Sequence, residues 1–113
     1  MSKYALYVGR YQPLHEGHIY LFEQKINQNV PVCIAIRDVE TDEKNPFTAE
    51  QVKYTIEDQL KHHILNNMLK VIIIPDIESI CYGRDVGYKI EQLEVPKEIA
   101  EISATKIRKE MGL

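Results

Sequence analysis

Hydrophobic residues follow two different spacings along the first part of the chain. Residues 3 to 8 combine β-branched and aromatic side chains in an alternating pattern that stops at Gly9, which predicts a strand. Between residues 18 and 29, apolar side chains recur every three or four positions, which predicts a helix with one buried face. Residues 30 to 36 are almost continuously apolar, as expected of a parallel strand that is covered on both faces.

A polar, highly charged stretch follows, residues 37 to 46, and it is expected to form a loop. Thr48 and Gln51 then have the spacing of a capping box, which predicts that a helix begins there. The helix is expected to bury three apolar side chains: Val52, Ile56 and Leu60.

Residues 69 to 74 have the third strong strand pattern, which Pro75 closes. The pattern weakens after this point. It predicts short strands near residues 79 to 82 and 88 to 93, and a last helix from about residue 103.

Strands that alternate with helices predict an α/β fold in which the strands pair in parallel through right-handed crossovers. We therefore expect a single domain over residues 1 to 113, a Rossmann-like doubly wound parallel sheet of about five strands. In such sheets, ligands bind beyond the carboxyl ends of the strands. Residues 9 to 18 and 37 to 46 both follow strands, so both are expected at that edge.

Composition supports one packed core, because 44% of the 113 residues are hydrophobic. The formal net charge of −3 argues against a general nucleic-acid binder, which is usually basic. No apolar run approaches the roughly 18 residues that span a membrane, and no secretory signal is evident, so a cytoplasmic location is expected. Cys33 and Cys81 lie in apolar, strand-like runs and are expected to be reduced thiols in the core.

The turn after the first strand contains two histidines and two glycines. Gly17 would let the backbone approach a ligand closely, and the helix that starts there would offer N–H groups to an anion. His15 and His18 can each donate a hydrogen bond to a phosphate oxygen, and either could carry charge near neutral pH. The alternative is that these histidines only cap a helix or bind a metal. The strong zinc pattern has histidines four residues apart and a further ligand, so we favour a phosphate site.

Three motifs resemble those of the HxGH nucleotidylyltransferase superfamily, which includes cytidylyltransferases and nicotinamide-mononucleotide adenylyltransferases. The first is Gly-Arg-Tyr-Gln-Pro at residues 9 to 13, followed by His-Glu-Gly-His at residues 15 to 18. The second, Lys-Asn-Pro-Phe-Thr at residues 44 to 48, resembles a loop of archaeal-type adenylyltransferases. The third, Ile-Ser-Ala-Thr-Lys-Ile-Arg at residues 102 to 108, resembles the family's C-terminal I-S-x-T-x-I-R motif.

The resemblance implies a nucleotidyl transfer from a nucleoside triphosphate to a phosphorylated small molecule, with release of pyrophosphate and no covalent enzyme intermediate. The chemistry would depend on positioning and on stabilising charge. Mg²⁺ would bridge the phosphates through water and ligand oxygens, without a cage of protein ligands. The implied catalytic residues are His15, His18 and Arg108. The implied nucleotide- and phosphate-binding residues are Gly9, Arg10, Tyr11, Gly17, Lys44, Ser103 and Thr105.

Charged residues beyond other strands are candidates for binding the acceptor or the ribose: Arg37, Asp38, Arg84 and Asp85. The alternative for each is a surface ion pair. The helix from residue 103, without the other motifs, would be an ordinary capped terminal helix. His62 and His63 are expected to close a helix C-terminus, where cationic side chains suit the helix dipole.

The nucleotide and the acceptor stay open at this point. The motifs at residues 9 to 13 and 45 to 48 favour ATP, whereas the short chain and the Gly-Arg-Asp loop at residues 83 to 85 favour the small cytidylyltransferases. The absence of tryptophan, and Gln51 where many relatives have arginine, count against NAD synthesis. Transfer from CTP or ATP is therefore expected, with nicotinamide-mononucleotide adenylyltransferase as the alternative and a non-catalytic nucleotide-binding module as a third possibility. A small domain of this kind is expected to form a homodimer or higher homo-oligomer.

Overall fold

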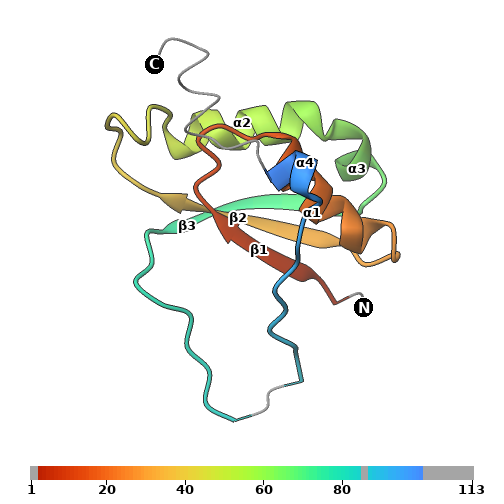
Figure 1. Cartoon of the computed structure of the whole chain (residues 1–113). Helices are drawn as coiled ribbons and strands as arrows, with labels where there is room; N and C mark the ends of the chain where they lie inside the picture. Colours follow the sequence, from red (N-terminus) through yellow and green to blue (C-terminus); the bar gives the residue numbers. More distant parts are fainter. Residues whose placement is uncertain (1–2, 85–86, 101–113) are drawn as a thin grey trace.

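Three parallel strands form the centre of the computed structural model, which describes residues 3 to 84 and 87 to 100. The strands are β1 (Ala5–Gly9), β2 (Val32–Asp38) and β3 (Leu69–Pro75), and they lie in the order β1-β2-β3. The helices are α1 (Glu16–Ile26), α2 (Ala49–Gln59), α3 (Lys61–Leu65) and α4 (Lys97–Ala100) (Figure 1). The three strong strand patterns and the two long helices of the sequence are thus confirmed.

Strand register places the candidate loops at one edge of the sheet. Gly9 lies opposite Ile36, and Asp38 lies opposite Pro75. The carboxyl ends of all three strands therefore meet at the edge where the turn before α1 and the loop before α2 begin. This is the edge at which open α/β sheets bind ligands.

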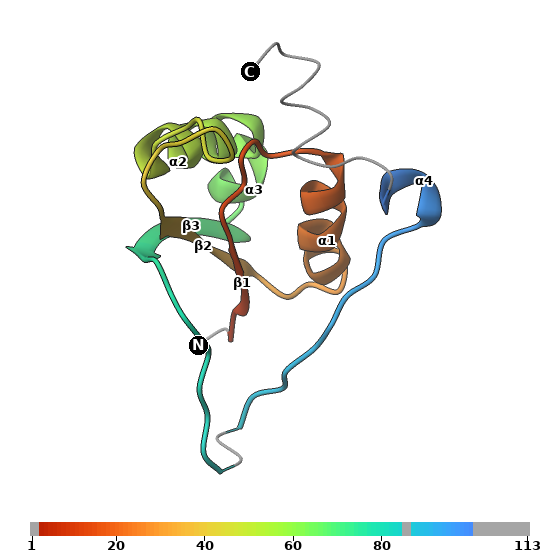
Figure 2. The ribbon, with the colours of Figure 1, turned by 60° about the vertical axis from the view of Figure 1, so that its left-hand side comes forward.

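The core lies between the helices and one face of the sheet. Phe22 of α1 and Ile56 of α2 are buried against Ile34 and Ile36 of β2, all at 1% exposure or less. In the described part of the chain the helices lie together on one side of the strands (Figures 1 and 2). On the other face Ala35 of β2 is 1% exposed and Cys33 is partly buried, so the prediction that residues 30 to 36 form a strand covered on both faces is confirmed, whereas Leu6 of the edge strand β1 is 61% exposed.

The two short strands expected near residues 79 to 82 and 88 to 93 are not found, so the described sheet has three strands and not five. Residues 76 to 84 instead run away from the sheet, and residues 87 to 96 return beside α1 (Figure 2). On the return, Lys25 pairs with Glu91 at 2.6 Å, and the Gln24 side chain donates to the carbonyl of Glu94 at 2.8 Å.

The physical reason is that strand propensity describes a fit to a pleated, half-buried surface. Ile80, Tyr82, Tyr88 and Ile90 are all more than half exposed, so their apolar side chains have no such surface to pack on. Cys81 is exposed in the same segment, so the expectation of a core thiol is wrong there; Cys33 is partly buried. The order β1-β2-β3 also contains no reversal of strand order among the described residues, so the doubly wound topology stays a prediction.

Candidate functional site

Helix α1 begins with a cap made of two histidine side chains. His15 is the N-cap residue, and its Nδ1 accepts a hydrogen bond from the backbone N–H of Gly17 at 3.1 Å. In return, Nδ1 of His18 accepts from the backbone N–H of His15 at 3.2 Å. The histidines therefore satisfy backbone donors that would otherwise be unpaired at the helix start. One of the N–H groups that we expected to meet an anion, that of Gly17, is already used.

These two hydrogen bonds fix the protonation pattern of both rings. A nitrogen that accepts from a backbone N–H carries no proton, so each neutral imidazole holds its proton on Nε2. The rings of His15 and His18 stack, with centroids 3.7 Å apart and planes inclined by 19°. The site therefore presents two adjacent Nε2–H donors.

Burial disfavours charge on both rings. It lowers the pKa of His18 to about 4, with a smaller contribution from His15, and it also lowers the pKa of His15. The expectation that either ring is charged near neutral pH is therefore wrong for the ligand-free protein. Both rings therefore remain able to donate a hydrogen bond through Nε2 while neutral.

Tyr11 supports the ring of His18 from the side. It is only 6% exposed, and its ring meets that of His18 edge-on at 4.8 Å. A Cβ on Gly9 would lie 3.0 Å from Cζ of Tyr11, so glycine at this position makes room for the tyrosine ring. Gly9 and Tyr11, which the resemblance placed among the phosphate ligands, are therefore found behind His18, where they position it.

Gly17 has the same kind of role toward the other histidine. A Cβ at Gly17 would lie 2.9 Å from Cε1 of His15, too close for both to keep their places. It would also lie 3.6 Å from the side chain of Ile99 in α4, so α4 reaches the start of α1. Glycine at this position therefore makes room for the imidazole of His15, and the close approach of its backbone to a ligand stays a prediction.

The histidine turn is tied to the loop before α2. The side chain of Gln12 is buried, donates to the carbonyl of Phe47 at 2.8 Å and accepts from its N–H at 3.0 Å. Arg10 donates to the side-chain oxygen of Asn45 at 3.2 Å. Sequence reasoning missed Gln12 and Asn45. Each is a polar residue directly before a proline within a motif, but nothing local indicates that two segments 35 residues apart are joined.

The loop that carries Lys44 is folded around Asp42. One carboxylate oxygen of Asp42 accepts from the backbone N–H groups of Lys44 and Asn45 at 2.8 and 2.7 Å. The bond from Asn45 is the main reason that the pKa of Asp42 lies below its usual value. The side chain of Lys44 is exposed at the ligand-binding edge. The loop is thus ordered by its own hydrogen bonds.

The remaining candidate site residues lie in several different parts of the chain. Arg37 pairs with Asp76, with Nη2 2.7 Å from the carboxylate, so of its two alternatives the structure shows the surface ion pair. Arg84 is exposed in the segment that leaves the sheet, far along the chain from the histidine turn. Four candidates lie outside the described residues: Asp85, Ser103, Thr105 and Arg108.

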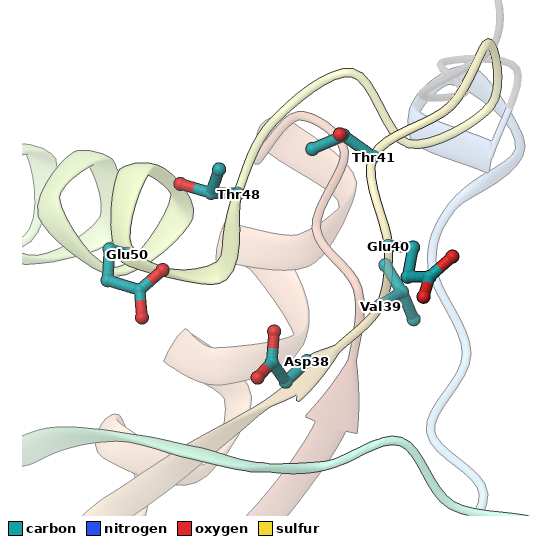
Figure 3. A pocket seen from close by; sticks show the side chains of 6 residues that line it. All are labelled: Asp38, Val39, Glu40, Thr41, Thr48 and Glu50. Atoms are coloured by element: carbon teal, nitrogen blue, oxygen red, sulfur yellow. The ribbon is translucent and has the colours of Figure 1, made fainter.

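An open hollow of about 500 Å³ lies where β2 ends and α2 begins. Its lining residues are Asp38, Val39, Glu40, Thr41, Thr48 and Glu50. Figure 3 shows the carboxylates of Asp38 and Glu50 facing the space between the strand end and the helix start, while Glu40 is directed away. Three acidic residues make this hollow unsuited to a bare triphosphate. Carboxylates here suit ribose hydroxyl groups or a bound cation.

The structure thus combines a parallel α/β sheet with a His-Glu-Gly-His turn at the carboxyl end of β1. This is the arrangement expected for the class of nucleotidylyltransferases that the motifs resemble. The sequence is similar to nicotinamide-nucleotide adenylyltransferases of Thermococcus onnurineus (35% identical over 79 residues, 68% of this chain and 42% of that protein) and Thermococcus kodakarensis (35% over 80 residues, 68% and 43%). It is also similar to a nicotinamide/nicotinic acid mononucleotide adenylyltransferase of Acinetobacter baylyi (31% over 71 residues, 56% and 38%).

No protein-family model matches the chain. The chain spans about two fifths of the length of these curated relatives (42%, 38% and 43%). The similarity to these relatives, together with the His-Glu-Gly-His turn, shows that the chain belongs to the HxGH nucleotidylyltransferase superfamily, as the motifs indicated. None of the described helices is long and apolar enough to cross a membrane.

Proposed function

We propose that this chain transfers the adenylyl group of ATP to nicotinamide mononucleotide, with release of pyrophosphate. The observation that carries the proposal is the pair of neutral imidazoles at His15 and His18, which present two Nε2–H donors side by side. The choice of adenine and of the nicotinamide acceptor rests on the names of the similar proteins. These names favour adenylyl transfer to nicotinamide mononucleotide, the alternative given above, over the cytidylyl transfer that the short chain indicated.

In the proposed reaction an oxygen of the acceptor phosphate attacks the α-phosphorus of ATP. A new P–O bond forms, the bond to the β-phosphate oxygen breaks, and pyrophosphate leaves with the electron pair. His18 would donate Nε2–H to an α-phosphate oxygen, and His15 would donate to the same oxygens or to the leaving group. Such donors stabilise the charge that develops in the transition state.

The leaving pyrophosphate would be held from the other end of the chain. In this proposal Ser103, Thr105 and Arg108 bind it, as the I-S-x-T-x-I-R motif implies, and Lys44 closes over it. The contact of Ile99 with the start of α1 supports this arrangement, because the described chain ends beside the two histidines. Arg10, an exposed residue whose guanidinium donates to Asn45, would add positive charge nearby.

Mg²⁺ is proposed to accompany the triphosphate. The histidine turn offers N–H donors and imidazoles, whereas Mg²⁺ prefers oxygen ligands, so phosphate oxygens and water would supply most ligands of the ion. When bound, Mg²⁺ would neutralise phosphate charge. Asp38 in the acidic hollow is the proposed contact for a ribose hydroxyl, whereas Arg37 is already paired with Asp76. A homodimer and a cytoplasmic location stay predictions.

The decisive experiment measures pyrophosphate release by the purified chain with Mg²⁺, ATP and nicotinamide mononucleotide. CTP in place of ATP is the matched control for the base, and a panel of other phosphorylated small molecules is the control for the acceptor. We expect release with ATP and nicotinamide mononucleotide only. Release with CTP and another acceptor would move the assignment to the cytidylyltransferases. Tight ATP binding without release for any pair would instead indicate a non-catalytic nucleotide-binding module.

A further inference from the structure

A second group of histidines lies apart from the histidine turn, where the C-terminal half of α1 meets α3. Glu23, His62 and His63 each offer one potential ligand atom, and these atoms all lie within 4.8 Å of one another. Nε2 of His63 is 3.3 Å from a carboxylate oxygen of Glu23, and the rings of His62 and His63 have centroids 3.9 Å apart. No described residue of the proposed nucleotide site belongs to this group.

We propose that Glu23, His62 and His63 bind a divalent transition-metal ion of the Zn²⁺ type. Imidazole nitrogens with one carboxylate suit zinc and its first-row neighbours, whereas Mg²⁺ prefers oxygen ligands alone. Three protein ligands with one position left for water is a usual zinc arrangement. The site is distinct from the phosphate-bound Mg²⁺ of the proposed reaction and does not depend on it.

The observed distances are close to those of a metal site. Zinc with ligand bonds of about 2.1 Å in a tetrahedron separates its ligand atoms by about 3.4 Å. The pair formed by His63 and Glu23 already has this separation, at 3.3 Å. The remaining gaps have to close by at most about 1.4 Å. Rotation of the exposed His62 side chain can provide that movement.

The backbone that carries these ligands is held in place. The carbonyl of His63 accepts from Met68 at 2.9 Å, and that of His62 accepts from Asn66 at 3.2 Å. Leu60, directly before α3, is 3% exposed, and Phe22, directly before Glu23, is 1% exposed. Ligands on an anchored framework lose little freedom when the ion binds, which favours affinity.

The alternative is an ordinary ion pair between His63 and Glu23, in which His62 takes no part. The two differ in the role of His62, because an ion pair does not need it and a metal site does. A metal that joins α1 to α3 would also stabilise the folded chain, since the unfolded chain does not hold the ligands together.

The test is isothermal titration of the chelator-stripped full chain with ZnCl₂, with MgCl₂ as the comparison, followed by thermal unfolding with and without Zn²⁺. We expect one Zn²⁺ per chain with a micromolar or lower Kd. At about 100 times the Kd, the ion is expected to raise Tm by roughly 10 °C. His62→Ala and Glu23→Gln are each expected to weaken binding at least about tenfold.

Two variants serve as controls. Glu57→Gln makes the same change as Glu23→Gln on a partly exposed helix position outside the group, and His15→Ala removes a histidine of the other pair; both are expected to keep zinc binding. Absence of zinc binding below millimolar concentration in the unmodified chain would overturn the proposal. So would binding that survives His62→Ala unchanged, or binding that is lost in His15→Ala. His62 is exposed, so His62→Ala tests the proposal even if a variant at the less exposed His63 fails to fold.

Discussion

The imidazoles of His15 and His18 are stacked with their centroids 3.7 Å apart, and each accepts a backbone hydrogen bond through Nδ1. The stack means that a proton added to one ring places positive charge against the other. Both rings are therefore held in the form that donates from Nε2 without carrying charge. In the proposed function such a site would bind a phosphate through hydrogen bonds, and the charge balance would come from Lys44, Arg10 and the proposed Mg²⁺.

Stability should fall in acid because His18 is buried in its neutral form. Its pKa is about 4 in the folded chain, against 6.5 for an ordinary histidine. Between these values the unfolded chain binds more protons, so the free energy of unfolding decreases as the pH falls from 6.5 toward 4. The loss from this group is at most about 3 kcal/mol and stops below its folded pKa. Urea denaturation at stepped pH values measures it, with His18→Gln as the comparison. An unchanged pH slope in that variant would refute the assignment.

Loss of His18 should remove turnover without unfolding the chain. His18→Ala deletes one of the two Nε2–H donors, and removal of a transition-state donor of this kind costs roughly 10²- to 10³-fold in kcat. His18→Gln can place an amide N–H near the same point, so it should retain more activity than alanine. Circular dichroism checks the fold, and His62→Ala, outside the nucleotide site, controls for loss of a histidine as such. Near-normal turnover by His18→Ala would contradict the proposed role.

Gly17→Ala should displace His15. The added Cβ would lie 2.9 Å from Cε1 of the ring, so the imidazole has to leave the position in which it caps α1. We expect at least a tenfold weaker interaction with ATP, measured by titration calorimetry. Gly83→Ala is the matched control, because a Cβ there meets nothing within 4 Å. Equal ATP affinity in the two variants would show that the ring does not depend on the glycine.

The link between Gln12 and Phe47 should contribute to stability. Gln12→Ala removes a buried side chain that both donates to and accepts from the backbone of Phe47, and it leaves those two groups without this partner. The expected loss is about 2 kcal/mol in the free energy of unfolding. Gln59→Ala, at an exposed position, should change it by less than about 0.5 kcal/mol. Urea denaturation compares the two, and a similar small effect for both would argue against a structural role for the link.

The sequence was sufficient for features that depend on local pattern. The alternation up to Gly9, the apolar run of β2 and the Thr48–Gln51 capping box each indicated an element that the structure contains. Local pattern also indicated strands near residues 79 to 82 and 88 to 93, and there it was wrong. A strand needs a neighbouring strand and a surface to cover, and periodicity reports neither.

The candidate site was predictable in its residue types and not in its geometry. The motif marked His15 and His18, but not that each ring would accept a backbone N–H and so hold its proton on Nε2. That result depends on the backbone at the start of α1 and on the space at Gly17. The joining of Gln12 to Phe47 and the pairing of Arg37 with Asp76 are contacts between segments 35 and 39 residues apart, which no local spacing encodes.

The ion pair of Arg37 and Asp76 gives a last prediction, which separates a surface contact from a ligand-binding role. The guanidinium is already held 2.7 Å from the carboxylate, and both side chains are partly exposed, at 31% and 51%. Asp76→Asn should therefore lower the free energy of unfolding by less than about 1 kcal/mol. If Arg37 serves only this pair, Arg37→Ala should leave KM for the acceptor within about twofold, because the substitution then removes no contact with the acceptor. Steady-state kinetics with varied acceptor measures this. A KM raised tenfold in Arg37→Ala and lowered in Asp76→Asn would show instead that the carboxylate competes with the acceptor phosphate for the guanidinium.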